Sequence, residues 1–232
     1  MSVGAGRGVP GPRTGGLAPR QAASVYDRIG RLQDTQVVFE APALARLTAD
    51  GRLSEAHCVV EIGCGTGRFA RELLTNVCGP ECRYVGLDVS PRMCRIATAR
   101  LSRWSTRARV MQVDGTLPLP LAAAEADRVL AAFVVDLLPT EYARQLLADT
   151  HRVLAPGGLL CLTSLVEGTT RASRAFASAW SILARRAPAL LGGCRPVVLA
   201  DLLDTDCWAV HTDTTLTARG VPAGILVAER GQ

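Results

Sequence analysis

The stretch VVEIGCGTGRFA, residues 59–70, decides the fold of this chain. Two β-branched residues precede Glu61, and glycines follow at alternate positions 63, 65 and 67 before an amphipathic segment begins. β-Branched residues favour a strand, and glycines at this spacing allow a sharp turn that brings a ligand against bare main chain. The stretch therefore predicts a buried strand, a glycine turn and a helix whose first N–H groups are unpaired.

The glycine spacing separates two kinds of cofactor site. A dinucleotide fingerprint has a gap of two residues before its last glycine and places a pyrophosphate at the helix N-terminus. Here that gap is one residue, and Glu61 stands at the strand end, where it would repel a pyrophosphate. An acid at this position suits a ligand that carries an ammonium group. An NAD-linked oxidoreductase is therefore the less favoured alternative.

Further strand-like segments follow in order along the chain. They are YVGLDVS at 84–90, RVMQVDG at 109–115, ADRVLAAF at 126–133 and HRVLAPGGLLCL at 151–162. The first of them ends in Asp88, 21 residues after Gly67, which is where a Rossmann-like unit needs a carboxylate for the ribose hydroxyls. The second ends in Asp114. Each segment is weak evidence alone, and their order and spacing make the set specific.

Over residues 57–165 the set resembles the class I S-adenosylmethionine-dependent methyltransferases of the small-molecule type, such as the quinone-biosynthesis enzymes. The resemblance implies an α/β fold, a Rossmann-like doubly wound seven-stranded sheet that is mostly parallel with an antiparallel last strand. It also implies S-adenosyl-L-methionine as cofactor, S-adenosyl-L-homocysteine as product, and no metal. Two strand-like segments near the C-terminus, 207–217 and 225–229, match the expected last pair.

The resemblance also assigns cofactor-binding residues. Glu61 faces the methionine end, Asp88 accepts from the ribose hydroxyls, and Asp114 accepts from the adenine amino group. The remaining members of the set are Gly63, Cys64, Gly65 and Gly67 in the turn, Val89 against the adenine, Gly115, and Tyr26 in the N-terminal cover. Two alternatives stay open, because an aspartate before a glycine also suits a plain turn, and Tyr26 also suits simple packing.

Asp136 is the candidate catalytic residue. It lies just beyond the fourth predicted strand, at the carboxyl edge where open α/β sheets bind ligands. It could deprotonate a hydroxyl or an amine, or it could cap a helix that starts near Pro139. The stretch 131–134 reads AAFV, without the Asn/Asp-Pro-Pro-aromatic run of enzymes that methylate base amino groups, and no Pro-Cys nucleophile pair is present.

Composition excludes several classes of protein. The net charge of +5 comes entirely from scattered arginines, and with 4% aromatic residues it argues against a dedicated nucleic-acid surface. No apolar run is long enough to span a bilayer. Only Cys78 and Cys82 of the eight cysteines form a close pair, with no partner pair for a zinc site, so reduced thiols and a cytoplasmic location are expected.

The predicted organisation is a disordered tail at 1–20 and one methyltransferase domain at 21–232. A basic, acid-free tail also has the charge of an organelle-targeting leader, although it lacks the serine content. The domain divides into a helical cover at 21–50 with a break at Pro42, the core at 57–165, a helical insert at 166–205 and a strand pair at 206–232. The insert helix at 172–187 is expected to pack on the core, with a substrate lid as the alternative.

These observations predict an enzyme of the EC 2.1.1 class, a methyltransferase that transfers a methyl group to a small, apolar or amphipathic acceptor by in-line displacement. The acceptor preference rests on the Val/Leu/Phe-rich segment after the fourth strand. The main alternative is a non-catalytic binding or scaffold protein that keeps the same fold.

Overall fold

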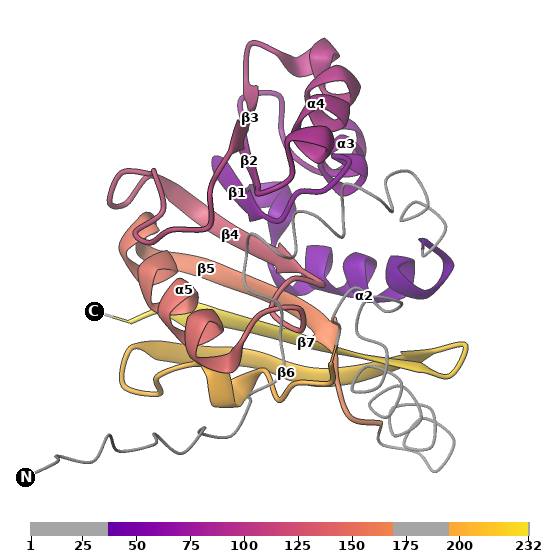
Figure 1. Ribbon diagram of the computed structural model, residues 1–232, viewed down its shortest axis with the longest axis vertical. Helices are drawn as coiled ribbons and strands as arrows, with labels where there is room; N and C mark the ends of the chain where they lie inside the picture. Colours follow the sequence, from indigo (N-terminus) through magenta and orange to yellow (C-terminus); the bar gives the residue numbers. More distant parts are fainter. Residues whose placement is uncertain (1–36, 169–194, 232) are drawn as a thin grey trace, which may run out of the picture.

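The computed structural model describes residues 37–168 and 195–231, and in these ranges seven strands form one sheet in the order β3-β2-β1-β4-β5-β7-β6 (Figure 1). The strands are β1 Cys58–Ile62, β2 Arg83–Asp88, β3 Ala108–Gln112, β4 Ala126–Ala132, β5 Leu154–Leu165, β6 Trp208–Ala218 and β7 Val221–Arg230. Strands β1 to β5 pair in parallel, whereas β7 is antiparallel to both β5 and β6. The predicted doubly wound, seven-stranded fold is confirmed.

Helices cover both faces of this sheet (Figure 1). They are α2 Val37–Asp50, α3 Arg68–Asn76, α4 Pro91–Arg100 and α5 Thr140–Val153, with short 3-10 turns η2 Leu53–Glu55, η3 Ser102–Trp104 and η5 Ala200–Leu202. One apolar cluster joins α2 and α3 to the sheet, and a second joins α5 to the opposite face. Because both faces are covered, β1 is buried at all five positions, which explains why its sequence is an apolar run rather than an alternation.

The parallel register gathers the site loops at one edge of the sheet. Ile62 at the end of β1 is paired with Leu87 on β2 and with Ala131 on β4, and Asp88 is paired with Gln112 on β3. The loops after β1, β2, β3 and β4 therefore leave the sheet side by side. The chain order reverses around β1, which is where open α/β sheets form their ligand crevice.

The predicted helix break at Pro42 is wrong, because α2 continues through this residue. Proline costs the helix one hydrogen bond, but the buried face beyond it, with Ala43 and Leu47 at 1% and 0% exposure, packs against the sheet near β5 and β7. Burial of that face offsets the lost bond. The helical residues predicted before position 37, the tail at 1–20, Tyr26 and the insert helix at 172–187 lie outside the described residues.

The connection between the last two strands is also shorter than predicted. A turn at Arg219 and Gly220, both with positive φ (51° and 86°), joins β6 directly to β7, so residues 221–224 belong to the strand. Two consecutive left-handed residues make the hairpin turn whose twist matches the flanking strands. The sequence had suggested a loop there because Pro222 and Gly224 are both unusual within a strand.

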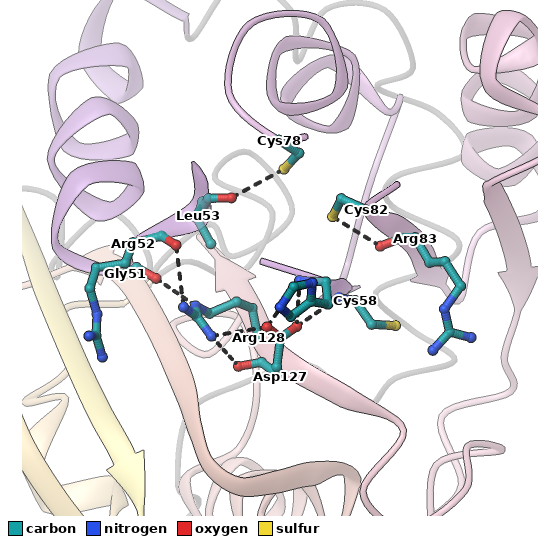
Figure 2. A network of polar contacts seen from close by, with 10 residues as sticks. Gly51, Arg52, Leu53, Cys58, Cys78, Cys82, Arg83, Asp127 and Arg128 are labelled. Carbon is teal, nitrogen blue, oxygen red and sulfur yellow. Dashed lines mark hydrogen bonds and ion pairs between the residues drawn. The ribbon is translucent and has the colours of Figure 1, made fainter. Parts of the chain in front are cut away.

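A polar network attaches the C-terminal end of α2 to the amino ends of strands β1 and β4 (Figure 2). Arg128 on β4 is 7% exposed, and its Nε donates to the carbonyl of Gly51 at 2.7 Å, just beyond α2. Asp127 beside it accepts from the main-chain N–H groups of His57 and Cys58 at 3.0 and 2.7 Å. One pair of side chains, Asp127 and Arg128, thereby joins the start of β4 to the start of β1 and to the end of α2.

Candidate functional site

The glycine turn after β1 has the backbone that its sequence demands. Gly63, Gly65 and Gly67 have φ values of 69°, 53° and 71°, a left-handed region that costs other residues about 1–2 kcal/mol each. The N–H groups of Gly63 and Cys64 both donate to the carbonyl of Leu87, at 2.7 and 3.0 Å. The turn is therefore held against the end of β2, and α3 begins immediately after it at Arg68.

The surroundings of the three glycines differ. A Cβ at Gly63 would lie 2.4 Å from Cγ2 of Val134, and one at Gly67 would lie 3.0 Å from Cβ of Ala97. At Gly65 a Cβ would meet nothing within 4 Å in the described part of the chain. Gly63 and Gly67 are thus required by packing as well as by φ, whereas Gly65 faces open space in the described part of the chain.

Glu61 is buried directly below this turn. Its side chain is 3% exposed, and the phenol of Tyr84 donates to its Oε2 at 2.5 Å. Burial raises the pKa of Glu61 to about 8, against the lowering effects of the Tyr84 hydrogen bond and the positive charge of Arg68. Glu61 was expected at the site from its motif, whereas no motif pointed to Tyr84, which stands two residues before Gly86 on the neighbouring strand.

Asp88 joins the glycine turn to the next helix. Its carboxylate is 8% exposed and accepts the N–H of Gly65 at Oδ2 and the N–H of Ser90 at Oδ1, both at 2.8 Å. Ser90 in turn caps α4 by accepting from the N–H of Met93 at 3.1 Å, with Pro91 in the first helical turn. Val89 between them follows the end of β2 and is half-buried, and its contact with the adenine stays a prediction.

Asp114 lies in an exposed turn two residues after the end of β3. Its Oδ1 accepts from both the N–H and the hydroxyl of Thr116, at 2.9 and 2.6 Å. This is the geometry of a plain turn, one of the two alternatives that the sequence leaves open for Asp114. Gly115 has a φ of 78°, and its carbonyl accepts from the phenol of Tyr142 on α5 at 2.8 Å. Tyr142 was missed because a single tyrosine in a helix carries no signal of its own.

Asp136 is more deeply buried than expected for a residue just beyond a strand. It is 1% exposed, and its Oδ2 accepts from the N–H of Leu165 at 3.4 Å, at the end of β5. The alternative role as a helix cap is not seen, because Pro139 is the N-cap residue of α5 and no side chain caps that helix. Burial raises the pKa of Asp136 to about 6, while the neighbouring Ser164 hydroxyl, main-chain N–H groups and, least, the charge of Arg195 lower it.

Arg195 completes this corner of the site. Its main-chain N–H donates to the carbonyl of Asp136 at 3.0 Å, and its guanidinium donates to the carbonyl of Leu138 and the hydroxyl of Thr140, both at 2.9 Å. The segment that enters the described region at residue 195 is therefore tied to the loop after β4. Sequence reasoning did not find this arginine, because nothing in its own neighbourhood points to a partner 59 positions earlier.

Phe133 is the strained residue of the site. It follows β4 directly and has a φ of 54°, a conformation that is rare for an aromatic residue. Its N–H donates to the carbonyl of Thr163 at 2.8 Å, and its ring packs with the cluster under α2 and α3. The next residue, Val134, packs on Gly63 from the other side. Backbone strain of this kind persists where the surroundings impose it, and it commonly lies at functional sites.

The described residues contain no group of three His, Cys, Asp or Glu side chains that could hold a metal ion, and seven described cysteines are free. Cys64 is 5% exposed, and burial raises the pKa of its thiol well above the ordinary value. Its side chain therefore behaves as a small apolar group, while its main chain forms the turn. The buried carboxyl groups of Glu61 and Asp88 at this end of the sheet are hydrogen-bond acceptors, which suits an organic ligand with an ammonium group and hydroxyls.

Comparison with known proteins agrees with this geometry. Residues 59–158 match the family model described as a methyltransferase domain. The middle of the chain is therefore similar to methyltransferase domains. The match runs from the strand before the glycine turn to the start of the fifth strand, which is the span in which the motifs indicated that family.

Individual relatives differ in what their names say they methylate. The chain is 30% identical over 124 residues to the tRNA N(3)-methylcytidine methyltransferase Mettl2 of Drosophila melanogaster, covering 52% of this chain and 38% of that protein. It is 30% identical over 152 residues to a malonyl-[acyl-carrier protein] O-methyltransferase of Marinomonas sp. (strain MWYL1), covering 65% of this chain and 53% of that protein. The methyltransferase domain thus spans about half or less of these relatives.

Solved structures share the fold at low sequence identity. The [4+2]-cyclase SpnF superposes with a TM-score of 0.70 at 16% identity, covering 94% of this chain and 99% of that one. The N-methyltransferase NodS of Bradyrhizobium japonicum WM9, in complex with S-adenosyl-L-homocysteine, gives 0.65 at 19% identity, covering 91% and 99%. No helix in the described ranges is long and apolar enough to cross a membrane.

Proposed function

We propose that this domain is an S-adenosylmethionine-dependent methyltransferase of the EC 2.1.1 class that acts on a small, apolar or amphipathic acceptor. The observation that carries the proposal is the glycine turn between Glu61 and α3, where Gly65 alone of the three glycines opens onto free space. The family match over residues 59–158 supports the same conclusion.

Each side chain at the edge has a role in this proposal. Glu61 receives the ammonium of the methionine end, and the open face of Gly65 receives the ligand against main chain. Asp88 stands at the end of β2 beside the glycine turn, and its carboxylate is assigned to the ribose hydroxyls. Asp114 and Gly115 are assigned to the adenine, and Tyr26, outside the described residues, is assigned to the N-terminal cover over the cofactor.

The chemistry that the cofactor supplies when bound is a methyl group already activated on a sulfonium, open to in-line displacement. The protein then has to orient the acceptor behind that methyl group, which is worth on the order of 7–11 kcal/mol in well-placed intramolecular reactions. The loop after β4 is suited to this task because its strained backbone at Phe133 and the Val134 contact to Gly63 hold it beside the turn. The preference for an apolar acceptor rests on the Val/Leu/Phe-rich sequence of this loop.

Asp136 remains the proposed general base. Its pKa of about 6 lies near working pH, as catalysis by proton transfer requires, whereas its 1% exposure and its link to Leu165 favour a structural role. Asp136→Asn separates the two roles. If the plot of kcat against pH loses its acidic limb while the acceptor KM is unchanged, Asp136 is the general base. If the unfolding temperature falls while that plot is unchanged, the role of Asp136 is structural.

The decisive test of the function is thermal stabilisation by S-adenosylmethionine, S-adenosylhomocysteine and NADH. A ligand at a hundred times its Kd adds about 2.7 kcal/mol, which for a domain of this size moves the midpoint by roughly 5–10 °C. We expect that shift with both adenosyl ligands and none with NADH. No shift with either adenosyl ligand, in folded protein, would remove the methyltransferase proposal and leave the scaffold or, if NADH binds, the oxidoreductase.

Binding alone does not establish catalysis, because the fold also serves the cyclase SpnF. Release of S-adenosylhomocysteine should therefore be followed with panels of apolar, carboxylic and nucleic-acid acceptors, since the relatives are named for a malonyl carrier protein and a tRNA. Turnover with one class identifies the acceptor. Tight binding without turnover in any panel favours the non-catalytic alternative.

A cytoplasmic location is part of the same proposal and rests on the reduced cysteines expected of that compartment.

A further inference from the structure

The side chain of Tyr84 crosses from one strand to the acid of the next. The register pairs Val59 with Tyr84 and Glu61 with Gly86, so Tyr84 and Glu61 are diagonal neighbours on β2 and β1. Residues two apart on a strand point to the same face, and long side chains reach their diagonal neighbours. The phenol therefore lies over Gly86 and donates to Oε2 of Glu61 at 2.5 Å.

Gly86 makes room for this contact. A Cβ at position 86 would lie 3.0 Å from the Tyr84 phenol oxygen and 2.9 Å from Sγ of Cys64. Any side chain there would displace the phenol from Glu61 or the turn from the end of β1. The small residue between Tyr84 and Asp88 is thus part of the same arrangement.

The two oxygens of the Glu61 carboxyl group are not equivalent. Oε2 is held by Tyr84, and within the described residues the side chain of Glu61 makes no second hydrogen bond. Tyr84 is 1% exposed, and burial together with the nearby charges raises its pKa well above the ordinary value. Its phenol therefore stays protonated and acts as a donor, which leaves Oε1 as the oxygen that a ligand can reach.

We propose that Tyr84 is a positioning residue for the cofactor: it holds Glu61 by Oε2 so that Oε1 meets the α-ammonium group of the methionine end. The proposal rests on the proposed function, because it requires an adenosyl ligand with an amino-acid end. In this proposal Tyr84 does not contact the ligand itself and acts on it only by orienting Glu61.

The charges around Glu61 make ligand affinity depend on its hydrogen bond to Tyr84 in a way that varies with pH. Arg68 on α3 and the Tyr84 phenol favour its ionised form, whereas burial and the carboxylate of Asp88 on β2 oppose it, and the thiol of Cys64 in the turn is neutral. Without the phenol, Glu61 keeps its proton to higher pH. The ammonium ligand must then displace that proton, so its affinity below about pH 8 falls.

The experiment is calorimetric titration of Tyr84→Phe, which keeps the ring and removes the hydroxyl. S-adenosylhomocysteine carries the ammonium group, and 5′-methylthioadenosine lacks the whole amino-acid end. We expect the first to bind about tenfold more weakly at pH 7, as for loss of a hydrogen bond to a charged group, with a deficit that shrinks as the pH rises, and the second to bind unchanged. In a Glu61→Gln background, Tyr84→Phe should cause no further loss.

Tyr142→Phe is the matched control, because it removes the phenol that holds Gly115 at the other end of the site. It should leave the ratio of the two affinities unchanged. An unaltered Kd and pH profile in Tyr84→Phe, or an equal loss for both ligands, would overturn the positioning role. If the wild-type protein binds neither ligand, the proposed function itself fails, and this inference fails with it.

Discussion

Oδ2 of Asp88 accepts the N–H of Gly65 at 2.8 Å across the 23 positions that separate them in the chain. The acid at the end of β2 thus holds the one glycine of the turn that faces open space, and through Ser90 it also holds the start of α4. Asp88, which is expected to bind the ribose, therefore also connects the loop after β1 to the loop after β2. Its two roles can be separated by measuring stability and binding together.

Asp88→Ala should lower the free energy of unfolding as well as abolish ligand binding. The substitution leaves the N–H groups of Gly65 and Ser90 without their acceptor, at a cost of about 1–3 kcal/mol. Urea unfolding without ligand checks the first effect, and the thermal shift checks the second. Asp114→Ala is the control, since that acid is exposed and bonded to its own turn. Equal stability of the two variants would contradict the prediction.

Gly65 and Gly63 should respond differently to alanine. Gly65→Ala should cost only the left-handed strain, about 1–2 kcal/mol, yet lose S-adenosylhomocysteine binding because the methyl group enters the ligand space. Gly63→Ala should cost more, because its Cβ would overlap Val134. The measurements are urea unfolding and calorimetric titration of each variant.

The double variant Gly63→Ala, Val134→Ala tests the cause of the second effect. Shortening Val134 removes the overlap, so part of the stability lost in Gly63→Ala should return, while the strain of the positive φ remains. Strictly additive losses would show that the two residues do not meet.

The buried acid Glu61 should make the ligand-free domain less stable as the pH rises. Its pKa is about 8 when folded and near the ordinary 4.5 when unfolded, so between these values the folded state holds a proton that the unfolded chain releases. The free energy of unfolding from this group is highest below pH 4.5 and falls towards pH 8, by at most about 1.4 kcal/mol per pH unit. Above pH 8 the fall is complete.

Glu61→Gln removes this titration. The difference in unfolding free energy between variant and wild type should therefore shift in favour of the variant from pH 5 to pH 8, measured by urea denaturation. Asp136, whose pKa is raised to about 6, loses its own contribution between about pH 4 and 6 in both proteins, and the comparison cancels it. Parallel pH curves would show that Glu61 does not titrate in this window.

Arg128→Lys should destabilise the attachment of α2 by about 2 kcal/mol. Lysine keeps the charge but not the planar fork that reaches the carbonyls of Gly51 and Arg52 together, and the group is buried. Hydrogen exchange at the last turn of α2 reports the loss locally, and urea unfolding reports it globally. Arg46→Lys, in an exposed i,i+4 pair with Asp50, is the control and should cost less than about 0.5 kcal/mol.

Local sequence was sufficient for the fold and for the backbone of the site. Glycines at 63, 65 and 67 all have positive φ, and the acids at 61 and 88 close the strands they were expected to close, because a strand end and a glycine turn are properties of a few consecutive residues. Five strand-like segments in the right order then leave few topologies open, since crossovers between parallel strands are right-handed. The family followed from the same short motifs.

Tertiary structure alone decided what each side chain touches. Tyr84 meets Glu61 only because the register sets β2 diagonally beside β1, and Arg195 meets the loop of Asp136 only because the chain returns to the end of β4. Pro42 stays helical because its neighbours are buried against distant strands. The rule that proline breaks a helix considers only nearby residues and does not include this burial. Hydrogen-bond partners, burial and pKa depend on residues far apart in the chain, which is why the sequence indicated a candidate site and only the packing assigned its contacts.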